Sequence, residues 1–120
     1  MVISKFKWKK KTAIYIGRFQ PFHEGHKKIF IKALRKNKQV AILVMDSFNV
    51  NKKNPFTYRY VRNKITQSLS EYKGSFIIIK IPVVSEVVYG RKVGYRIRRI
   101  KVPKFIEKIS ATDIRKKILK

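Results

Sequence analysis

His23 and His26 are the two histidines of the chain, and only Glu24 and Gly25 separate them. Two imidazoles placed together can donate hydrogen bonds to phosphate oxygens and stabilise the negative charge on a transferring phosphoryl group. Gly25 has no side chain, so a ligand could approach the backbone closely between them. This short run therefore indicates phosphoryl or nucleotidyl chemistry.

A metal site is the first alternative. Histidines three residues apart can bind zinc, but the usual helical spacing is four residues with a third ligand. The chain has no cysteine and no further histidine to supply that ligand. We therefore predict no metal bound by protein side chains, while capping or packing roles for both histidines stay open.

A second candidate motif is the run from Ile109 to Arg115, Ile-Ser-Ala-Thr-Asp-Ile-Arg. Ser110 followed by Asp113 is typical of a capped helix start. Such a start also offers backbone N–H groups to phosphate, and Arg115, one turn later, could add a bidentate guanidinium. Together with the histidine run, this motif would provide the two ends of a triphosphate site.

The elements that must position these motifs follow from hydrophobic patterning. Apolar runs predict strands over residues 11–17, 39–45 and 76–81. Apolar spacing predicts a helix from Glu24 to about Asn37. It also predicts a helix capped by Thr57 and ended near Gly74.

The remaining elements are a short strand at 100–102 and a helix over 110–120, with broken structure between 83 and 99. Alternation of strands and helices predicts an α/β fold, a Rossmann-like open parallel sheet with helices on both faces. Ligands bind at the carboxyl ends of the strands in such sheets. The histidine run, Asp46 and the segment before Ser110 would all lie on that edge.

Length and composition limit the organisation of the chain. The 120 residues predict a basic N-terminal extension over 1–11 and one domain over 12–120. No run of eighteen apolar residues occurs, so we expect no membrane span. The N-terminus lacks the apolar core of a signal peptide, and there is no cysteine. We expect a cytoplasmic protein.

The formal net charge of +25 has two interpretations. The basic residues are spread along the whole chain, which favours a solvated surface that attracts anions in general. A basic surface that binds nucleic acid is the other interpretation. Aromatic residues in the basic N-terminal extension would also suit a second subunit, which leaves a homo-oligomer open.

Taken together, the two motifs resemble those of the nucleotidylyltransferase superfamily, in which a His-x-Gly-His turn and an Ile-Ser-x-Thr-x-x-Arg helix embrace a nucleotide. The Arg-Phe-Gln-Pro-Phe run after Gly17 is most similar to nicotinamide mononucleotide adenylyltransferases, whose Asn-Pro-Phe-Thr segment recurs at 54–57. Small cytidylyltransferase-like proteins are similar over about residues 12 to 116.

The resemblance implies a reaction and roles for individual residues. A nucleoside triphosphate, ATP in preference to CTP, would transfer its nucleotidyl group to a small phosphorylated acceptor and release pyrophosphate, with Mg²⁺ on the phosphates. His23 would contact the phosphates, and His26 would stabilise charge on the α-phosphate. The remaining implied nucleotide-binding residues are Gly17, Arg18, Phe19, Gly25, Ser110, Thr112 and Arg115, the last also catalytic.

Two further residues are candidates for the acceptor, Asp46 at the end of a strand and Arg91 in a basic turn. The rival hypothesis from another class is a nucleic-acid-binding module that has the same fold and no catalytic activity. Class I aminoacyl-tRNA synthetases share the His-x-Gly-His turn. The short chain, which lacks a Lys-Met-Ser-Lys-Ser-like segment, argues against that relationship.

Overall fold

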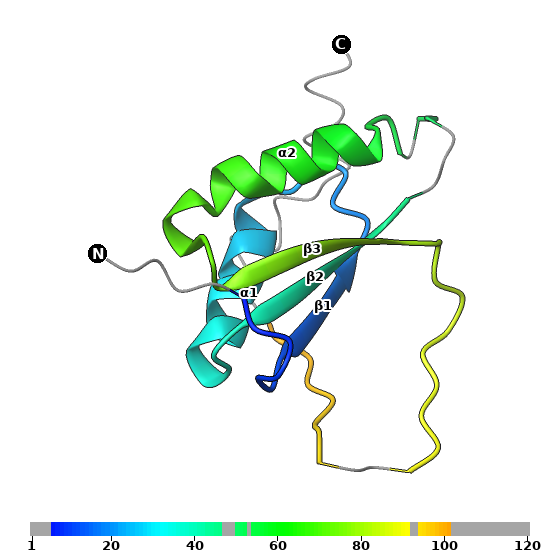
Figure 1. Ribbon diagram of the computed structural model, residues 1–120. Coiled ribbons are helices and arrows are strands. Elements are labelled where there is room, and N and C mark those ends of the chain that lie inside the picture. Colours follow the sequence, from blue (N-terminus) through cyan, green and yellow to red (C-terminus); the bar gives the residue numbers. More distant parts are fainter. Residues whose placement is uncertain (1–5, 47–49, 53, 92–93, 102–120) are drawn as a thin grey trace.

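The computed structural model describes residues 6–46, 50–52, 54–91 and 94–101 (Figure 1). Its elements are β1 (Ala13–Gly17), α1 (Glu24–Lys36), β2 (Val40–Met45), α2 (Tyr58–Ser68), a 3₁₀ turn (Ser70–Tyr72) and β3 (Phe76–Ile81). The strand predicted at 11–17 starts two residues later, and the one predicted at 39–45 starts one residue later. No helix in this described part is long and apolar enough to cross a membrane.

Two predicted elements, the strand at 100–102 and the helix over 110–120, are not among the observed elements. Ile100 and Lys101 have no strand structure, and the third residue of that predicted strand lies outside the described residues. The helix predicted over 110–120 also lies outside them.

The three strands form one parallel sheet in the order β1-β2-β3. Tyr15 pairs with Ile42, and Ile42 pairs with Ile78, so side chains of the three strands line up across the sheet. This arrangement confirms the predicted Rossmann-like α/β fold and places the carboxyl ends of all three strands on one edge.

The core lies on one face of this sheet. Val40, Ile42 and Val44 of β2 are fully buried. They pack with residues of both helices, namely Phe30, Ala33, Val61, Ile65 and Leu69. Two right-handed crossovers that step in the same direction across a sheet place their helices on the same face. Within the described residues, helices therefore cover one face, and the second helical layer that we expected is not found there.

Part of the predicted N-terminal extension is bonded to this core. Gln39, only 2% exposed, accepts a hydrogen bond from the Lys7 backbone N–H at 2.9 Å. Its side-chain amide donates to the Lys7 carbonyl oxygen at 2.6 Å and to the Thr12 hydroxyl at 2.8 Å. The chain from residue 7 to 12 is thus held against the start of β2, while the domain boundary near residue 11 stays a prediction.

Candidate active site at the start of helix α1

The candidate site begins where β1 ends at Gly17 and the chain turns toward α1. Phe19 has a backbone φ of 52°, a left-handed conformation that costs a non-glycine residue about 1–2 kcal/mol. This turn brings the Phe19 ring back over Gly17, where a Cβ would lie only 2.8 Å from the ring. Gly17 is therefore needed for this packing, and the Phe19 side chain, 2% exposed, lies in the core.

The aromatic residues of the turn surround His26. The Phe19 ring meets the imidazole edge to face at 5.0 Å between centroids, and the Phe22 ring stacks on it at 5.5 Å. The His23 ring lies 3.9 Å from the same imidazole. The packing fixes the orientation of His26 without a charged partner.

The two histidines also cap α1. Nδ1 of His23 accepts a hydrogen bond from the Gly25 backbone N–H at 3.0 Å. Nδ1 of His26 accepts one from the His23 backbone N–H at 3.1 Å, which completes a reciprocal capping box. Since an accepting nitrogen carries no proton, each neutral imidazole holds its proton on Nε2. Both Nε2–H groups are then donors available to a ligand.

Burial keeps these imidazoles neutral. Desolvation, with the nearby His23 as a smaller cause, lowers the pKa of His26 to about 3. Desolvation also lowers the pKa of His23, although the carboxylate of Glu24 partly opposes it. Two neutral donors beside the positive dipole end of α1 can therefore hold phosphate oxygens near pH 7. The capping role and the phosphate role are compatible, because they use different ring nitrogens.

Gln20 is a structural residue of this site that the sequence analysis missed. It is 5% exposed, and its side-chain amide donates to the Phe56 carbonyl oxygen at 2.9 Å. Its carbonyl oxygen accepts from the Phe56 backbone N–H, also at 2.9 Å. This pair of hydrogen bonds, here called the Gln20 clamp, fixes the turn before α1 to the segment before α2. In the sequence, the only sign of this role is a single amide side chain among aromatic residues. Its partner, Phe56, lies 36 residues away along the chain, so the sequence does not identify the pair.

The start of α2 is as predicted. The Thr57 hydroxyl accepts a hydrogen bond from the Tyr60 backbone N–H at 3.2 Å and caps the helix. The Tyr60 ring stacks on Phe56 with 4.5 Å between centroids. The Gln20 clamp and this stack together set the position of α2 next to the histidine turn.

A surface groove of about 330 Å³ runs between the two helices beside His23. Lys27 from α1 and Lys64 from α2 line it, with Tyr60 and Ser68. Lys27 forms an ion pair with Glu71 at 3.3 Å. Neither lysine stands out in the sequence, because the pattern of a helix does not show which neighbour its polar face meets.

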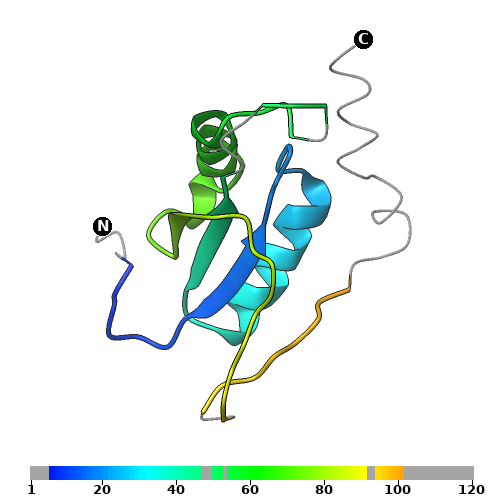
Figure 2. The same ribbon diagram turned by 90° about the vertical axis from the view of Figure 1, so that its right-hand side faces the viewer.

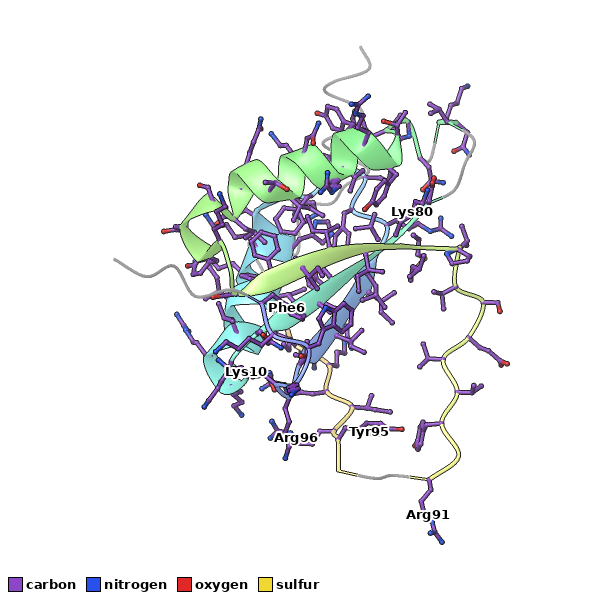
Figure 3. All side chains as sticks on the ribbon, viewed as in Figure 1. Phe6, Lys10, Lys80, Arg91, Tyr95 and Arg96 are labelled. Atoms are coloured by element: carbon purple, nitrogen blue, oxygen red, sulfur yellow. The ribbon has the colours of Figure 1, made fainter. Side chains whose placement is uncertain are left out.

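The remaining predicted site residues lie in different places. Arg18 is exposed in the same turn. Asp46 lies at the carboxyl end of β2, where its carboxylate is 4.0 Å from Lys80. Arg91 lies at the tip of a long loop (Figure 3). In both ribbon views this tip is at the end of the molecule opposite the turn between β1 and α1 (Figures 1 and 2).

The structure thus brings together Gly17, Phe19, His23, Gly25 and His26 and leaves Arg91 apart. Ser110, Thr112 and Arg115 lie outside the described residues. Within the described chain, no group of three or more His, Asp or Glu side chains could hold a metal ion.

Known proteins are similar to part of this chain. The nicotinamide-nucleotide adenylyltransferase of Picrophilus torridus is 35% identical over 72 residues, which is 59% of this chain and 42% of that protein. Two solved structures of a bifunctional NMN adenylyltransferase/ADP ribose pyrophosphatase from Francisella tularensis are 34% identical with TM-scores of 0.56. One of them is complexed with AMP and a manganese ion.

These similarities cover 61% of this chain and 23% or 22% of the Francisella chains, so the chain spans less than half the length of the relatives it matches. The sequence model of the cytidylyltransferase-like family matches residues 14–84, from β1 through the end of β3. This match includes the histidine turn and the Gln20 clamp, and it confirms the resemblance inferred from the motifs. The chain belongs to the cytidylyltransferase-like family.

Proposed function

We propose that the chain is a nucleotidyltransferase, which moves a nucleotidyl group from a nucleoside triphosphate to a small phosphorylated acceptor. Membership of the cytidylyltransferase-like family and the adenylyltransferase relatives support nucleotidyl transfer. The observation that carries the proposal is the pair of neutral imidazoles whose Nδ1 atoms cap α1 and whose Nε2–H groups are free for a ligand.

In the proposed reaction, a phosphate oxygen of the acceptor attacks the α-phosphorus of the triphosphate. A new P–O bond forms as the bond to the β-phosphate oxygen breaks, and pyrophosphate leaves with that electron pair. The acceptor phosphate is already anionic, so the step needs no general base and no covalent enzyme intermediate. Positioning and electrostatic stabilisation supply the rate enhancement.

His26 would donate its Nε2–H to a non-bridging oxygen of the α-phosphate, where negative charge grows in the transition state. His23 would donate in the same way to a neighbouring phosphate. Arg18 and the backbone near Gly25 would line the nucleotide site. The Phe19 ring, which packs over Gly17, would hold the His26 imidazole in place. Asp46 stays a candidate for the acceptor, whereas Arg91 has no part in this proposal because it lies far from the turn.

Ser110, Thr112 and Arg115 would hold the β- and γ-phosphates, as the family motif implies. ATP with nicotinamide mononucleotide is the first substrate pair to test, because the relatives' names specify it. CTP is the alternative triphosphate. Mg²⁺ would arrive on the triphosphate, since the described residues offer no cluster of metal ligands and Mg²⁺ often binds through substrate phosphates.

The test combines a pyrophosphate-release screen with three substitutions of His26. The four nucleoside triphosphates are assayed with Mg²⁺ against a panel of phosphorylated metabolites. His26→Ala removes both the cap and the donor, and His26→Glu keeps an acceptor for the His23 N–H but has no donor. His26→Gln keeps the acceptor and offers an amide N–H in place of the imidazole.

We expect turnover to fall by about 10²-fold or more in the Ala and Glu variants and by less in the Gln variant. Folding stability should fall by about 1 kcal/mol or more in the Ala variant, which loses the cap. It should also fall in the Glu variant, because a carboxylate would lie among the aromatic rings, so turnover is compared per folded molecule. Full turnover by the Glu variant would refute the role of His26. Failure of every triphosphate to bind or react, with nucleic-acid binding intact, would favour the non-catalytic module.

A further inference from the structure

The segment over residues 82–101, here called the arm, leaves the end of β3, projects beyond the sheet and returns toward α1 (Figures 1 and 2). The C-terminal end of the arm is held against the domain. Lys32 of α1 donates a hydrogen bond to the Lys101 carbonyl oxygen at 2.9 Å, and Ile100 packs against the core. Between these ends, the described residues of the arm form no helix or strand.

The arm exposes apolar and aromatic side chains that a solvated loop would not need. Tyr89 is 56% exposed and Tyr95 is 48% exposed, and their rings touch edge to face with 6.4 Å between centroids. Val87, Val88 and Ile97 are exposed by 68% or more. A concentration of exposed apolar surface of this kind indicates an interaction site.

The charge of the arm is strongly positive. Six of its residues are Lys or Arg and one is Glu. The ion pairs of the described chain are Lys27–Glu71 and Lys80–Asp46, so no described arginine of the arm has a carboxylate partner. Figure 3 shows Arg91 at the tip of the arm. The Tyr95 side chain points into the space between the outgoing and returning stretches of the arm, and the Arg96 side chain points away from that space. The arm therefore carries two touching aromatic rings and exposed guanidinium groups.

This combination suits a polymer that has both phosphates and flat bases. Single-stranded nucleic acid is bound by stacking bases on aromatic rings while basic side chains follow the backbone. A second copy of this chain fits less well, because each copy carries a net charge of +25 and would repel the other. Arginines also stack on bases, which lysines do not do as well.

We propose that the arm binds single-stranded nucleic acid, with Tyr89 and Tyr95 stacking on bases and Arg96 and Arg98 contacting phosphates. This function is separate from nucleotidyl transfer and does not depend on it. The tip of the arm lies at the end of the molecule opposite the histidine turn, so both activities can occur in one molecule (Figures 1 and 2). DNA and RNA strands share the chemistry that the arm recognises.

The test measures fluorescence anisotropy of labelled oligo(dT) and oligo(U) of about 12 nucleotides with the full chain at several salt concentrations. Tyr89→Ala/Tyr95→Ala should weaken binding by about 30-fold or more, and Tyr89→Phe/Tyr95→Phe should keep it, because Phe also stacks. Thermal unfolding should change little in either variant, since both tyrosines are about half exposed and lie outside the core cluster. Comparing the two oligonucleotides shows whether the ribose matters.

The matched control for charge is on α2. Arg96→Gln/Arg98→Gln should reduce the salt slope of binding by about 1.4. Arg59→Gln/Arg62→Gln, which removes two exposed arginines of α2, should leave the slope unchanged. Equal effects of the two pairs, or equal competition by poly-glutamate of the same charge, would reduce the binding to net charge and overturn the proposal.

Two other results would also overturn it. The Tyr→Ala pair would leave affinity unchanged if stacking had no part. Sedimentation would reveal a dimer that the Tyr→Ala pair dissociates if the arm were an interface between copies. Pyrophosphate release by the Tyr→Ala pair should equal that of the unaltered chain, which separates this test from that of the proposed transfer reaction.

Discussion

Replacing Gly17 with Ala is the most direct test of how the turn supports His26. The new Cβ would lie 2.8 Å and 2.9 Å from two ring atoms of Phe19, whereas ordinary contacts begin near 3.4 Å. The Phe19 ring would have to move by several tenths of an ångström. It has no free side, because Tyr15 lies 5.1 Å away, Phe22 5.6 Å and His26 5.0 Å between centroids.

The expected cost follows from this geometry. Overpacking a filled core typically costs about 1–3 kcal/mol. The reduced backbone freedom of alanine in the unfolded chain returns about 0.4–1 kcal/mol. We therefore expect Gly17→Ala to lower the free energy of unfolding by about 1–2 kcal/mol, which corresponds to a fall in Tm of about 4–10 °C for a chain of this size.

The assay is thermal and urea unfolding, followed by turnover with the substrate pair found in the screen. A displaced Phe19 ring would push His26, and a misplacement approaching 1 Å can cost up to about 10²-fold in rate. Gly90→Ala is the matched control, because a Cβ there meets no atom within 4 Å. That substitution should change stability by less than about 0.5 kcal/mol.

A double substitution isolates the clash. Leucine lacks the ring atoms that a Cβ at residue 17 would meet, so Gly17→Ala should cost less in a Phe19→Leu background. We expect the two substitutions to deviate from additivity by about 0.5–2 kcal/mol in the favourable direction. Strict additivity, or a Gly17→Ala protein as stable as the Gly90→Ala control, would refute the packing argument.

Two further predictions concern the same site. Gln20→Leu removes both hydrogen bonds to the Phe56 backbone and should lower the free energy of unfolding by about 2 kcal/mol. Gln20→Glu keeps the acceptor but places a buried carboxylate against the Phe56 carbonyl oxygen, so it should cost at least as much. Equal urea midpoints for the Leu variant and the unaltered chain would contradict this. The pKa of His26 is lowered to about 3, so between pH 6.5 and 3 the unfolded chain binds a proton that the folded chain does not. Stability should therefore fall as the pH falls, by on the order of 2 kcal/mol at pH 4.5 from this group, and urea unfolding of His26→Gln should show a correspondingly smaller loss.

Local patterns in the sequence were sufficient for much of the framework. The apolar runs located three strands, with β3 matching its predicted bounds, and the helical spacing located α1 to within a residue of its end. Thr57 was identified as a cap, but α2 ends at Ser68, six residues before the predicted stop at Gly74, and a separate 3₁₀ turn (Ser70–Tyr72) occupies part of the interval. These features depend on contacts between residues close in sequence, so propensity and capping chemistry determine them.

The arrangement of layers needed the folded structure. Hydrophobic patterning predicts that a strand is buried, but it does not give the order of strands in the sheet. With the order β1-β2-β3, α1 and α2 share one face. The prediction of helices on both faces included a closing helix over 110–120, which lies outside the described residues.

The sequence by itself determined that two histidines stand beside a glycine at the junction of a strand and a helix, and that the surrounding chain is basic. Only the tertiary structure decided which nitrogen of each imidazole carries the proton, why residue 17 must be glycine, and that Gln20 holds the segment at Phe56. The same is true of Arg91, which the fold places on the arm and away from the turn. The physical reason is that these properties depend on backbone geometry and packing, which the spacing of residues does not specify. The caps and the contact of Gly17 with Phe19 join residues only two or three apart but need the exact shape of the turn, and the partner of Gln20 lies 36 residues away.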